Sequence, residues 1–154
     1  MKTIISITAL MLLFMNFSLF SQNIVLQDDI YVDKDGKPFT GKYKEYYSDG
    51  ILKLEIEMVN GTKNGKGVLY FKNGNIQDVY SYKQNKMDGL WLTYNEKSIK
   101  TAEANYLNDK KDGSWKIWDE NGNLIYEMLY KNGEKTGIWI KHNDKGEEIA
   151  RKTY

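Results

Sequence analysis

Apolar and polar residues alternate in short runs along this chain, and turn residues separate the runs. Residues 52–58 alternate leucine, isoleucine and methionine with lysine and glutamate, and residues 124–130 show a similar alternation. An alternation of period two predicts β-strands with one face toward solvent. No run beyond residue 21 has an apolar stripe of helical period, so the chain is predicted to be all-β.

The runs recur with a period of 24 residues, without insertion or deletion. Glycine stands at 41, 65, 89, 113 and 137, and the column seventeen positions later holds Met58, Tyr82, Tyr106, Tyr130 and Tyr154. Each period contains two strand-length runs joined by a turn, which predicts one β-hairpin per period. We expect an elongated repeat array of about five 24-residue β-hairpins, forming an open, twisted antiparallel meander sheet of ten strands.

The turn inside each hairpin is marked by a pair of turn residues. Asp49-Gly50, Asn73-Gly74 and Asn121-Gly122 are typical of two-residue turns of the primed type, in which positive φ is required. Lys97-Ser98 replaces this pair in the third period. Asn60-Gly61 and Asn132-Gly133 mark the connections between hairpins, and Gln84-Asn85 and Asn108-Asp109 mark the remaining connections more weakly.

Two aromatic columns are the candidate binding surface. They lie two and five positions after each leading glycine, and only Gly67 and His142 interrupt them. An odd spacing places the two columns on opposite faces of a regular strand, so either both faces carry aromatics or a bulge re-aims one column. The aromatics either form the core of the sheet or line a binding groove. The candidate binding residues are Tyr43, Tyr46, Tyr70, Trp91, Tyr94, Trp115, Trp118 and Trp139.

The N-terminal segment has the features of a secretory signal peptide. Lys2 precedes an apolar run from Ile4 to Phe20, and the small residue Ser21 precedes a polar stretch. The predicted organisation is a signal peptide at 1–21, a lead-in at 22–36 that caps the first repeat, and a repeat domain at 37–154. Cleavage after Ser21 would place the chain in the periplasm or outside the cell; an uncleaved membrane anchor is the alternative.

Charge and cysteine content narrow the classes of partner. Removal of residues 1–21 takes away Lys2 and no acidic residue, so 21 basic and 21 acidic side chains remain. This balance argues against nucleic acid and against simple electrostatic binding to anionic lipid. The chain has no cysteine, which excludes a disulfide framework and a thiolate nucleophile.

Catalytic and metal-binding residues are sparse. His142 is the single histidine and occupies an otherwise aromatic column, so a structural role is favoured over a catalytic one. Glu55, Glu103 and Glu127 share one column, and this repetition indicates a solvated face with lysine partners on neighbouring strands, although paired carboxylates could also hydrolyse glycosides. No cofactor or metal is predicted, and the chain is expected not to be an enzyme.

The recurring pattern resembles a known family. The run from Asp112 to Gly133, which is repeated in part from Asp88 to Tyr106, resembles the bacterial variant of the MORN repeat, often described as the YwqK-like antitoxin family. The resemblance covers residues 37–154. It implies stacked β-hairpins in an open, groove-like sheet, and protein or membrane interaction rather than catalysis.

Two functions fit these observations. The first is an exported, non-catalytic module that binds a protein, with a toxin as candidate partner in an antitoxin- or immunity-like role. The alternative is a cell-envelope glycan-binding repeat protein that stacks sugar rings on its aromatic columns.

Overall fold

The computed structural model describes residues 23–154, and within this range the chain forms fourteen strands and no helix. The predicted signal peptide lies outside the described residues. Residues 23–154 accordingly include no helix that is long and apolar enough to cross a membrane. The strands are β1 (Val25–Gln27), β2 (Ile30–Val32), β3 (Gly41–Tyr46), β4 (Leu52–Val59), β5 (Thr62–Tyr70), β6 (Ile76–Lys83), β7 (Lys86–Met87), β8 (Gly89–Tyr94), β9 (Lys100–Leu107), β10 (Lys110–Lys111), β11 (Gly113–Trp118), β12 (Leu124–Lys131), β13 (Glu134–His142) and β14 (Glu148–Thr153).

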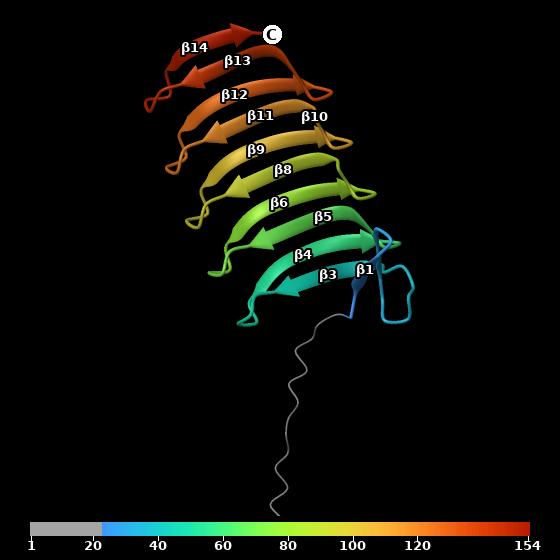
Figure 1. Ribbon diagram of the computed structural model, residues 1–154. Helices are drawn as coiled ribbons and strands as arrows, with labels where there is room; N and C mark the ends of the chain where they lie inside the picture. Colours follow the sequence, from blue (N-terminus) through green and yellow to red (C-terminus); the bar gives the residue numbers. More distant parts are fainter. Residues whose placement is uncertain (1–22) are drawn as a thin grey trace, which may run out of the picture.

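Ten of these strands form a continuous antiparallel meander. Their order in the sheet is β14-β13-β12-β11-β9-β8-β6-β5-β4-β3, with the short strands β7 and β10 pairing with β6 and β9. Figure 1 shows the curved hairpins stacked in chain order, from β3 at one end to β14 at the other. The prediction of an all-β, open, elongated meander of hairpins is therefore confirmed.

The two kinds of turn differ from the prediction. Within the first hairpin, the Gly50 amide donates to the Tyr47 carbonyl at 2.9 Å and only the glycine has positive φ, which makes this a longer turn than the expected two-residue primed type. Between hairpins, both turn residues have positive φ, as at Asn60 (49°) and Gly61 (76°) or Gln84 (49°) and Asn85 (66°). The primed turns thus lie at the connections between hairpins, which the sequence marks with Asn-Gly at 60–61 and 132–133 and with weaker pairs at 84–85 and 108–109.

Each repeat contains two irregularities at constant positions. On the returning strand of every hairpin one extra residue is unpaired, as Lys53 is between the pairs Glu45–Leu54 and Tyr46–Leu52. The leading glycine has positive φ in all five repeats, and at Gly65 a Cβ atom would collide with the Glu57 side chain. Glycine is required here because the strand kinks and closely approaches its neighbour.

The register divides the side chains between two faces. Trp115 and Trp118 lie three residues apart in one strand, so they point to opposite faces. Both faces therefore carry aromatics, and the bulge lies on the returning strand instead of re-aiming either column. We call the face of Trp91, Trp115 and Trp139 the aromatic face. The opposite face, which carries Glu55, Glu103 and Glu127, we call the ion-pair face.

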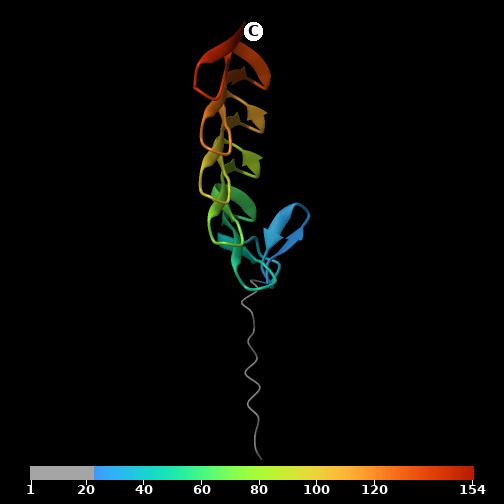
Figure 2. The same ribbon diagram turned by 90° about the vertical axis from the view of Figure 1, so that its left-hand side faces the viewer.

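The hairpin β1-β2 packs against the first repeat. The Tyr31 amide donates to the Gly61 carbonyl at 2.9 Å, and the Tyr31 ring lies 5.3 Å from the Tyr43 ring on the aromatic face. The most buried side chains lie nearby, with Met58 2% and Ile56 4% exposed. Figure 2 shows this hairpin projecting beside one end of the long, narrow array.

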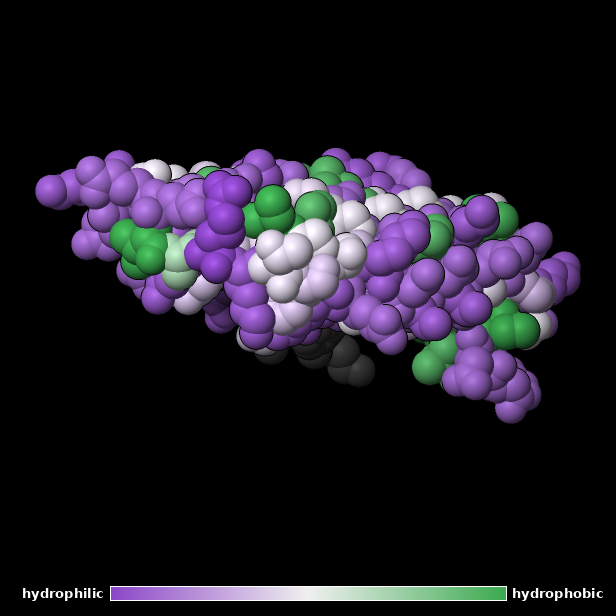
Figure 3. All heavy atoms as spheres, turned by 90° about the horizontal axis from the view of Figure 1, so that it is seen from above, coloured by the Kyte–Doolittle hydropathy of each residue, from purple (hydrophilic) through white to green (hydrophobic). Residues whose placement is uncertain are grey.

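The opposite end of the array is polar. Every residue of β14 is exposed, and its Arg151 and Lys152 stand in columns that hold Glu127 and Met128 in the previous repeat. Figure 3, which looks onto this end, shows mostly hydrophilic residues with hydrophobic ones in small separate patches. Charged side chains on an edge strand discourage pairing with a further strand.

Candidate functional site: the aromatic face

A continuous ladder of eight rings runs along the aromatic face. Each ring contacts the next, with centroid distances of 4.7 Å for Tyr80–Trp91, 5.3 Å for Trp115–Tyr130 and 4.9 Å for Trp139–Tyr154. Edge-to-face contacts such as the first and tilted contacts such as the other two contribute about 1 kcal/mol each beyond the burial of apolar area. In order along the array, the ladder consists of Tyr82, Tyr80, Trp91, Tyr106, Trp115, Tyr130, Trp139 and Tyr154.

The gap in the tryptophan column at Gly67 is filled from the neighbouring strand. Gly67 pairs directly with Tyr80, and a Cβ atom at Gly67 would lie 3.3 Å from the Tyr80 ring. In the next repeat the sizes are reversed, because Trp91 pairs with Ala104, which is 8% exposed. Each of these two cross-strand pairs therefore combines one large ring with one small residue. The ladder is continuous past Gly67 because Tyr80 supplies the ring.

The strand kinks anchor two of the tryptophans. The Trp115 indole nitrogen donates to the Asn105 carbonyl at 3.0 Å, and the Trp139 indole nitrogen donates to the Leu129 carbonyl at 3.0 Å. Both carbonyls lie opposite the kink at the leading glycine, where regular strand pairing is interrupted. Each indole thus donates to a backbone carbonyl at the kink, and at Asn105 it shares this acceptor with the Asp112 amide. These bonds fix the orientation of the rings.

Lysine side chains cover the rings. The Lys111 ammonium lies 4.2 Å from the Trp115 ring centroid and 4.8 Å from that of Tyr130. Lys135, one repeat later, lies 4.5 Å from Trp139 and 5.0 Å from Tyr154. These are cation–π distances, at which the positive charge is attracted to the ring but is not neutralised.

Burial raises the pKa of several tyrosines in the ladder and beside it. Burial, together with a hydrogen bond from its hydroxyl to Glu45, raises the pKa of Tyr43 to about 12. Burial likewise raises the pKa of Tyr106, and burial with the neighbouring Asp78 raises that of Tyr80. The phenols thus stay protonated well into alkaline solution.

The eight predicted binding residues do not form one surface. Tyr43, Trp91, Trp115 and Trp139 lie on the aromatic face, and the last three belong to the ladder. The register places the other four on the ion-pair face, where Trp118 contacts Lys100 at 4.2 Å. That second group is Tyr46, Tyr70, Tyr94 and Trp118.

Several residues of the aromatic face were not among the predicted binding residues. Tyr80 occupies a column that is aromatic only in the second repeat, so no periodic signal indicated it. Tyr106, Tyr130 and Tyr154 belong to a tyrosine column that was visible in the sequence. The lysines over the rings also recur at the 24-residue period, at 63, 111 and 135, with methionine at 87.

The ion-pair face has a different chemistry. Glu55 lies 2.8 Å from Lys42 and 3.3 Å from Lys44, and Glu127 lies 3.3 Å from Lys116. The expectation that this glutamate column pairs with lysines on neighbouring strands is confirmed at both positions. Glu103 is paired within its own strand, with Lys100 at 2.7 Å.

His142 takes a structural place on the same face. Its ring nitrogens lie 3.1 Å from the Glu127 carboxylate and 3.3 Å from the Gly146 carbonyl. These contacts tie the last turn to the fourth hairpin. Among residues 23–154, no group of His, Asp and Glu side chains is arranged to hold a metal ion.

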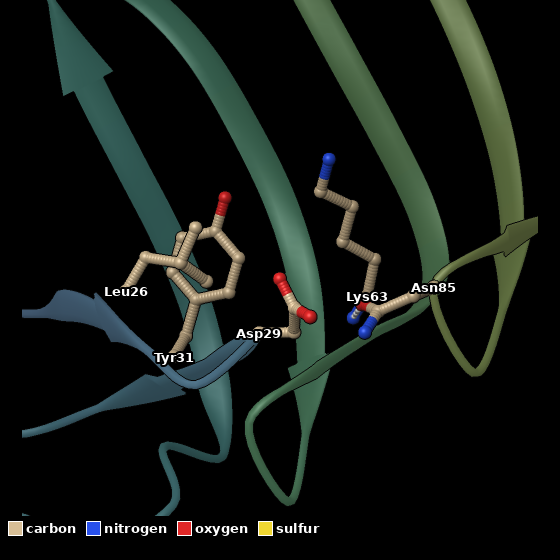
Figure 4. A pocket seen from close by; sticks show the side chains of 5 residues that line it. All are labelled: Leu26, Asp29, Tyr31, Lys63 and Asn85. Carbon is tan, nitrogen blue, oxygen red and sulfur yellow. Dashed lines mark hydrogen bonds between the residues drawn. The ribbon is translucent and has the colours of Figure 1, made fainter.

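Two shallow hollows occur on the aromatic face. One, near the N-terminal hairpin, has a volume of about 320 Å³; Figure 4 shows Asp29 and Tyr31 of that hairpin beside Lys63 and Asn85 of the array. The other, of about 390 Å³, lies at the C-terminal end. Its lining includes Tyr126, Trp139, Lys141, Lys152 and Tyr154.

Comparison with known proteins finds a family model that matches two of the repeats. The family model described as MORN repeat variant matches residues 39–60 and again residues 111–132. These segments are the first and fourth hairpins of the array. A search of curated proteins finds no match. The matches support a MORN-variant repeat protein, in agreement with the hairpin architecture.

Proposed function

We propose that this MORN-variant repeat protein is an exported, non-catalytic module that binds another protein. The observation that carries the proposal is the continuous ladder, in which each ring packs on the next at 4.7–6.1 Å. The ladder links successive hairpins into one extended surface on which aromatic and charged side chains remain partly exposed. Surfaces that bind proteins are enriched in tyrosine and tryptophan.

A glycan ligand is the second candidate, and the exposed aromatic rows favour it. Its support is weaker because sugar rings stack on open, flat aromatic faces. Along the ladder, consecutive rings meet at angles such as 59° for Trp115–Tyr130, and Lys111 lies over both of these rings. A sugar would have to displace the lysine and would find tilted rings beneath it.

Within the protein-binding class we propose an antitoxin- or immunity-like role. The likeness of the repeat from Asp112 to Gly133 to the YwqK-like antitoxin family supports this role. The predicted signal peptide at 1–21 requires that the partner toxin be met outside the cytoplasm. A gene for a secreted toxin beside the gene for this chain would strengthen the assignment.

The proposal is tested by capture from a cell-envelope extract. Full-length protein is expressed in its own cell type, and N-terminal sequencing establishes whether the chain begins after Ser21. The purified chain is then immobilised, and bound material is eluted separately with excess free chain and with soluble cell-wall glycan. We expect one protein to be eluted by the free chain and to be retained in the presence of glycan.

The matched controls address the partner class. A protease-treated extract should give no specific eluate if the partner is a protein. Elution by glycan, or undiminished binding after protease treatment, would overturn the proposal in favour of the glycan alternative. Retention of the full chain in the cytoplasm would refute export.

A further inference from the structure

Lysines on the two faces of the sheet have different partners. On the ion-pair face, Lys42, Lys44, Lys100 and Lys116 each contact a glutamate at 2.7–3.3 Å. On the aromatic face of the last two hairpins, four lysines contact rings, and none forms an ion pair with any of residues 23–154. These four are Lys111, Lys135, Lys141 and Lys152.

The positive charge on this part of the aromatic face is not balanced locally. In the fourth and fifth hairpins, the strand register brings no aspartate or glutamate to the aromatic face, whereas Glu127 and Glu148 both lie on the opposite face. The chain beyond residue 21 is therefore neutral as a whole, but this part of the aromatic face carries an excess of positive charge. A ring attracts an ammonium group without cancelling its charge, so this surface has a positive potential.

The other end of the aromatic face shows which kind of polypeptide can pack on such a surface. There the chain's own β1-β2 hairpin lies against the first repeat, and its turn is Asp28-Asp29. Asp29 and Lys63 line the same hollow, and Tyr31 packs on Tyr43 at 5.3 Å. A hairpin with an acidic turn and an aromatic side chain therefore already lies at one end of this face (Figure 4).

We infer that the aromatic face of the fourth and fifth hairpins binds an acidic, extended segment of a partner protein. Carboxylates of the segment would pair with Lys135, Lys141 and Lys152. The hollow of about 390 Å³ between Tyr126, Trp139 and Tyr154 would receive its apolar side chains. This inference rests on the proposed function, because it specifies where the protein partner binds and with which chemistry.

A protein segment fits this surface better than nucleic acid or a lipid membrane. Binding of single-stranded nucleic acid uses open ring faces for base stacking, but these rings lie at 54–59° to one another beneath lysines. The ammonium groups of Lys111 and Lys135 lie within 5.0 Å of ring centroids, so they do not extend outward toward a flat anionic surface. Burial of side chains in a hollow between positive groups suits an extended polypeptide.

The test uses the full chain and a synthetic fluorescent peptide that alternates glutamate and valine. Binding is followed by fluorescence anisotropy at low and at physiological salt. The double variant Lys135→Gln/Lys152→Gln is expected to raise Kd about tenfold, because two charge contacts are lost. The charge-conserving variant Lys135→Arg/Lys152→Arg should bind as the unchanged chain does, which separates charge from folding. The matched pair on the ion-pair face, Lys100→Gln/Lys116→Gln, should leave Kd within about twofold.

The outcomes distinguish this inference from the proposed function. Equal binding of a peptide with glutamine in place of glutamate, or equal loss in both glutamine variants, would overturn the inference. Binding of an oligothymidine or of phosphatidylserine vesicles in preference to the peptide would also overturn it. If the envelope protein is captured equally well by Lys135→Gln/Lys152→Gln, the protein-binding function stands and the assigned surface is wrong. If the captured material is glycan, the proposed function itself fails.

Discussion

Lysines on the ion-pair face contact carboxylates, whereas lysines on the aromatic face of the last two hairpins contact rings. The repeat places Lys116 opposite Glu127, but it places Lys111 over Trp115 and Tyr130. The first arrangement cancels charge, and the second leaves it exposed to a partner. A single-layer sheet can thus be neutral as a whole and still present one face for recognition.

The faces also differ in how they stabilise the array. Ring contacts on the aromatic face connect every hairpin from the second to the fifth. Ion pairs on the other face are partly exposed and lie at separate positions, and two of the glutamates pair with a neighbouring strand. Because exposed ion pairs contribute little, we expect the aromatic face to dominate stability.

The largest effect is expected from a matched pair of tryptophan substitutions. Trp115→Ala removes two ring contacts, the cover by Lys111 and the bond to Asn105, and should lower the free energy of unfolding by about 3 kcal/mol. Trp118→Ala on the ion-pair face removes the contact with Lys100 and should cost about 1 kcal/mol. Urea denaturation followed by circular dichroism measures both. Equal losses would contradict the assignment of the ladder to one face.

A smaller loss is expected when the kink that anchors the ladder is altered. Gly137 has φ of 61°, and a Cβ atom there would lie 2.9 Å from Leu129. Gly137→Ala should cost about 2 kcal/mol, from the positive φ and the close contact together. Gly146→Ala is the control, because Gly146 also has positive φ but has open space around it; its cost should be about 1 kcal/mol. Indistinguishable melting curves for the two variants would show that the close contact is unimportant.

Much of the fold followed from the 24-residue period, because each hairpin contacts only its neighbours in the array. Strand existence, meander order and open ends are local consequences of that period. The prediction of a two-residue turn within each hairpin is wrong, since Asx-Gly fits both a two-residue turn and the longer turn at Tyr47–Ile51. The bulge at Lys53 has no signature in side-chain type, and the parity of the aromatic columns does not indicate it, because those columns lie on the other strand of each hairpin.

The candidate site was harder to predict than the fold. Periodicity identified the tryptophan column, but it could not show that Tyr80 replaces the missing ring at Gly67, because that exchange occurs across a strand pair. Total charge could not show which lysines are neutralised. That distinction depends on register, which places Lys116 beside a carboxylate and Lys111 beside a ring.

Alkaline titration should report on the aromatic face. Tyr43 has a pKa of about 12 in the folded chain and about 10 when unfolded, so the unfolded state loses its proton first. The stabilisation is complete below pH 10 and is lost as the pH rises toward 12. Tyr43→Phe should cost about 1 kcal/mol at pH 7, through loss of the bond to Glu45, and should flatten the alkaline decline. An unchanged slope between pH 10 and 12 would contradict the raised pKa.

A gain in stability is expected at the turn of the third hairpin. Ser98 has φ of 62° at the position where the other four hairpins have glycine. Ser98→Gly should raise the free energy of unfolding by about 0.5–1 kcal/mol, because glycine adopts this conformation without steric cost. Gly74→Ser, at the equivalent turn with open space around it, is the reverse control and should lower the melting temperature. A lower melting temperature for Ser98→Gly would mean that the serine side chain stabilises the turn.

The smallest effect should come from the ion-pair face in acid. Hydrogen bonds from Lys42 and Lys44 hold the pKa of Glu55 below its ordinary value, so the unfolded state takes up a proton first as the pH falls. The contribution of Glu55 is therefore present above its unfolded pKa and is lost as the pH drops through the lowered folded pKa. Glu55→Gln should cost about 0.5 kcal/mol at pH 7, less in high salt and nothing in strong acid. Urea denaturation at pH 7 and in strong acid measures this loss of stability. Trp115→Ala on the aromatic face is the control, because its loss of stability should persist in acid.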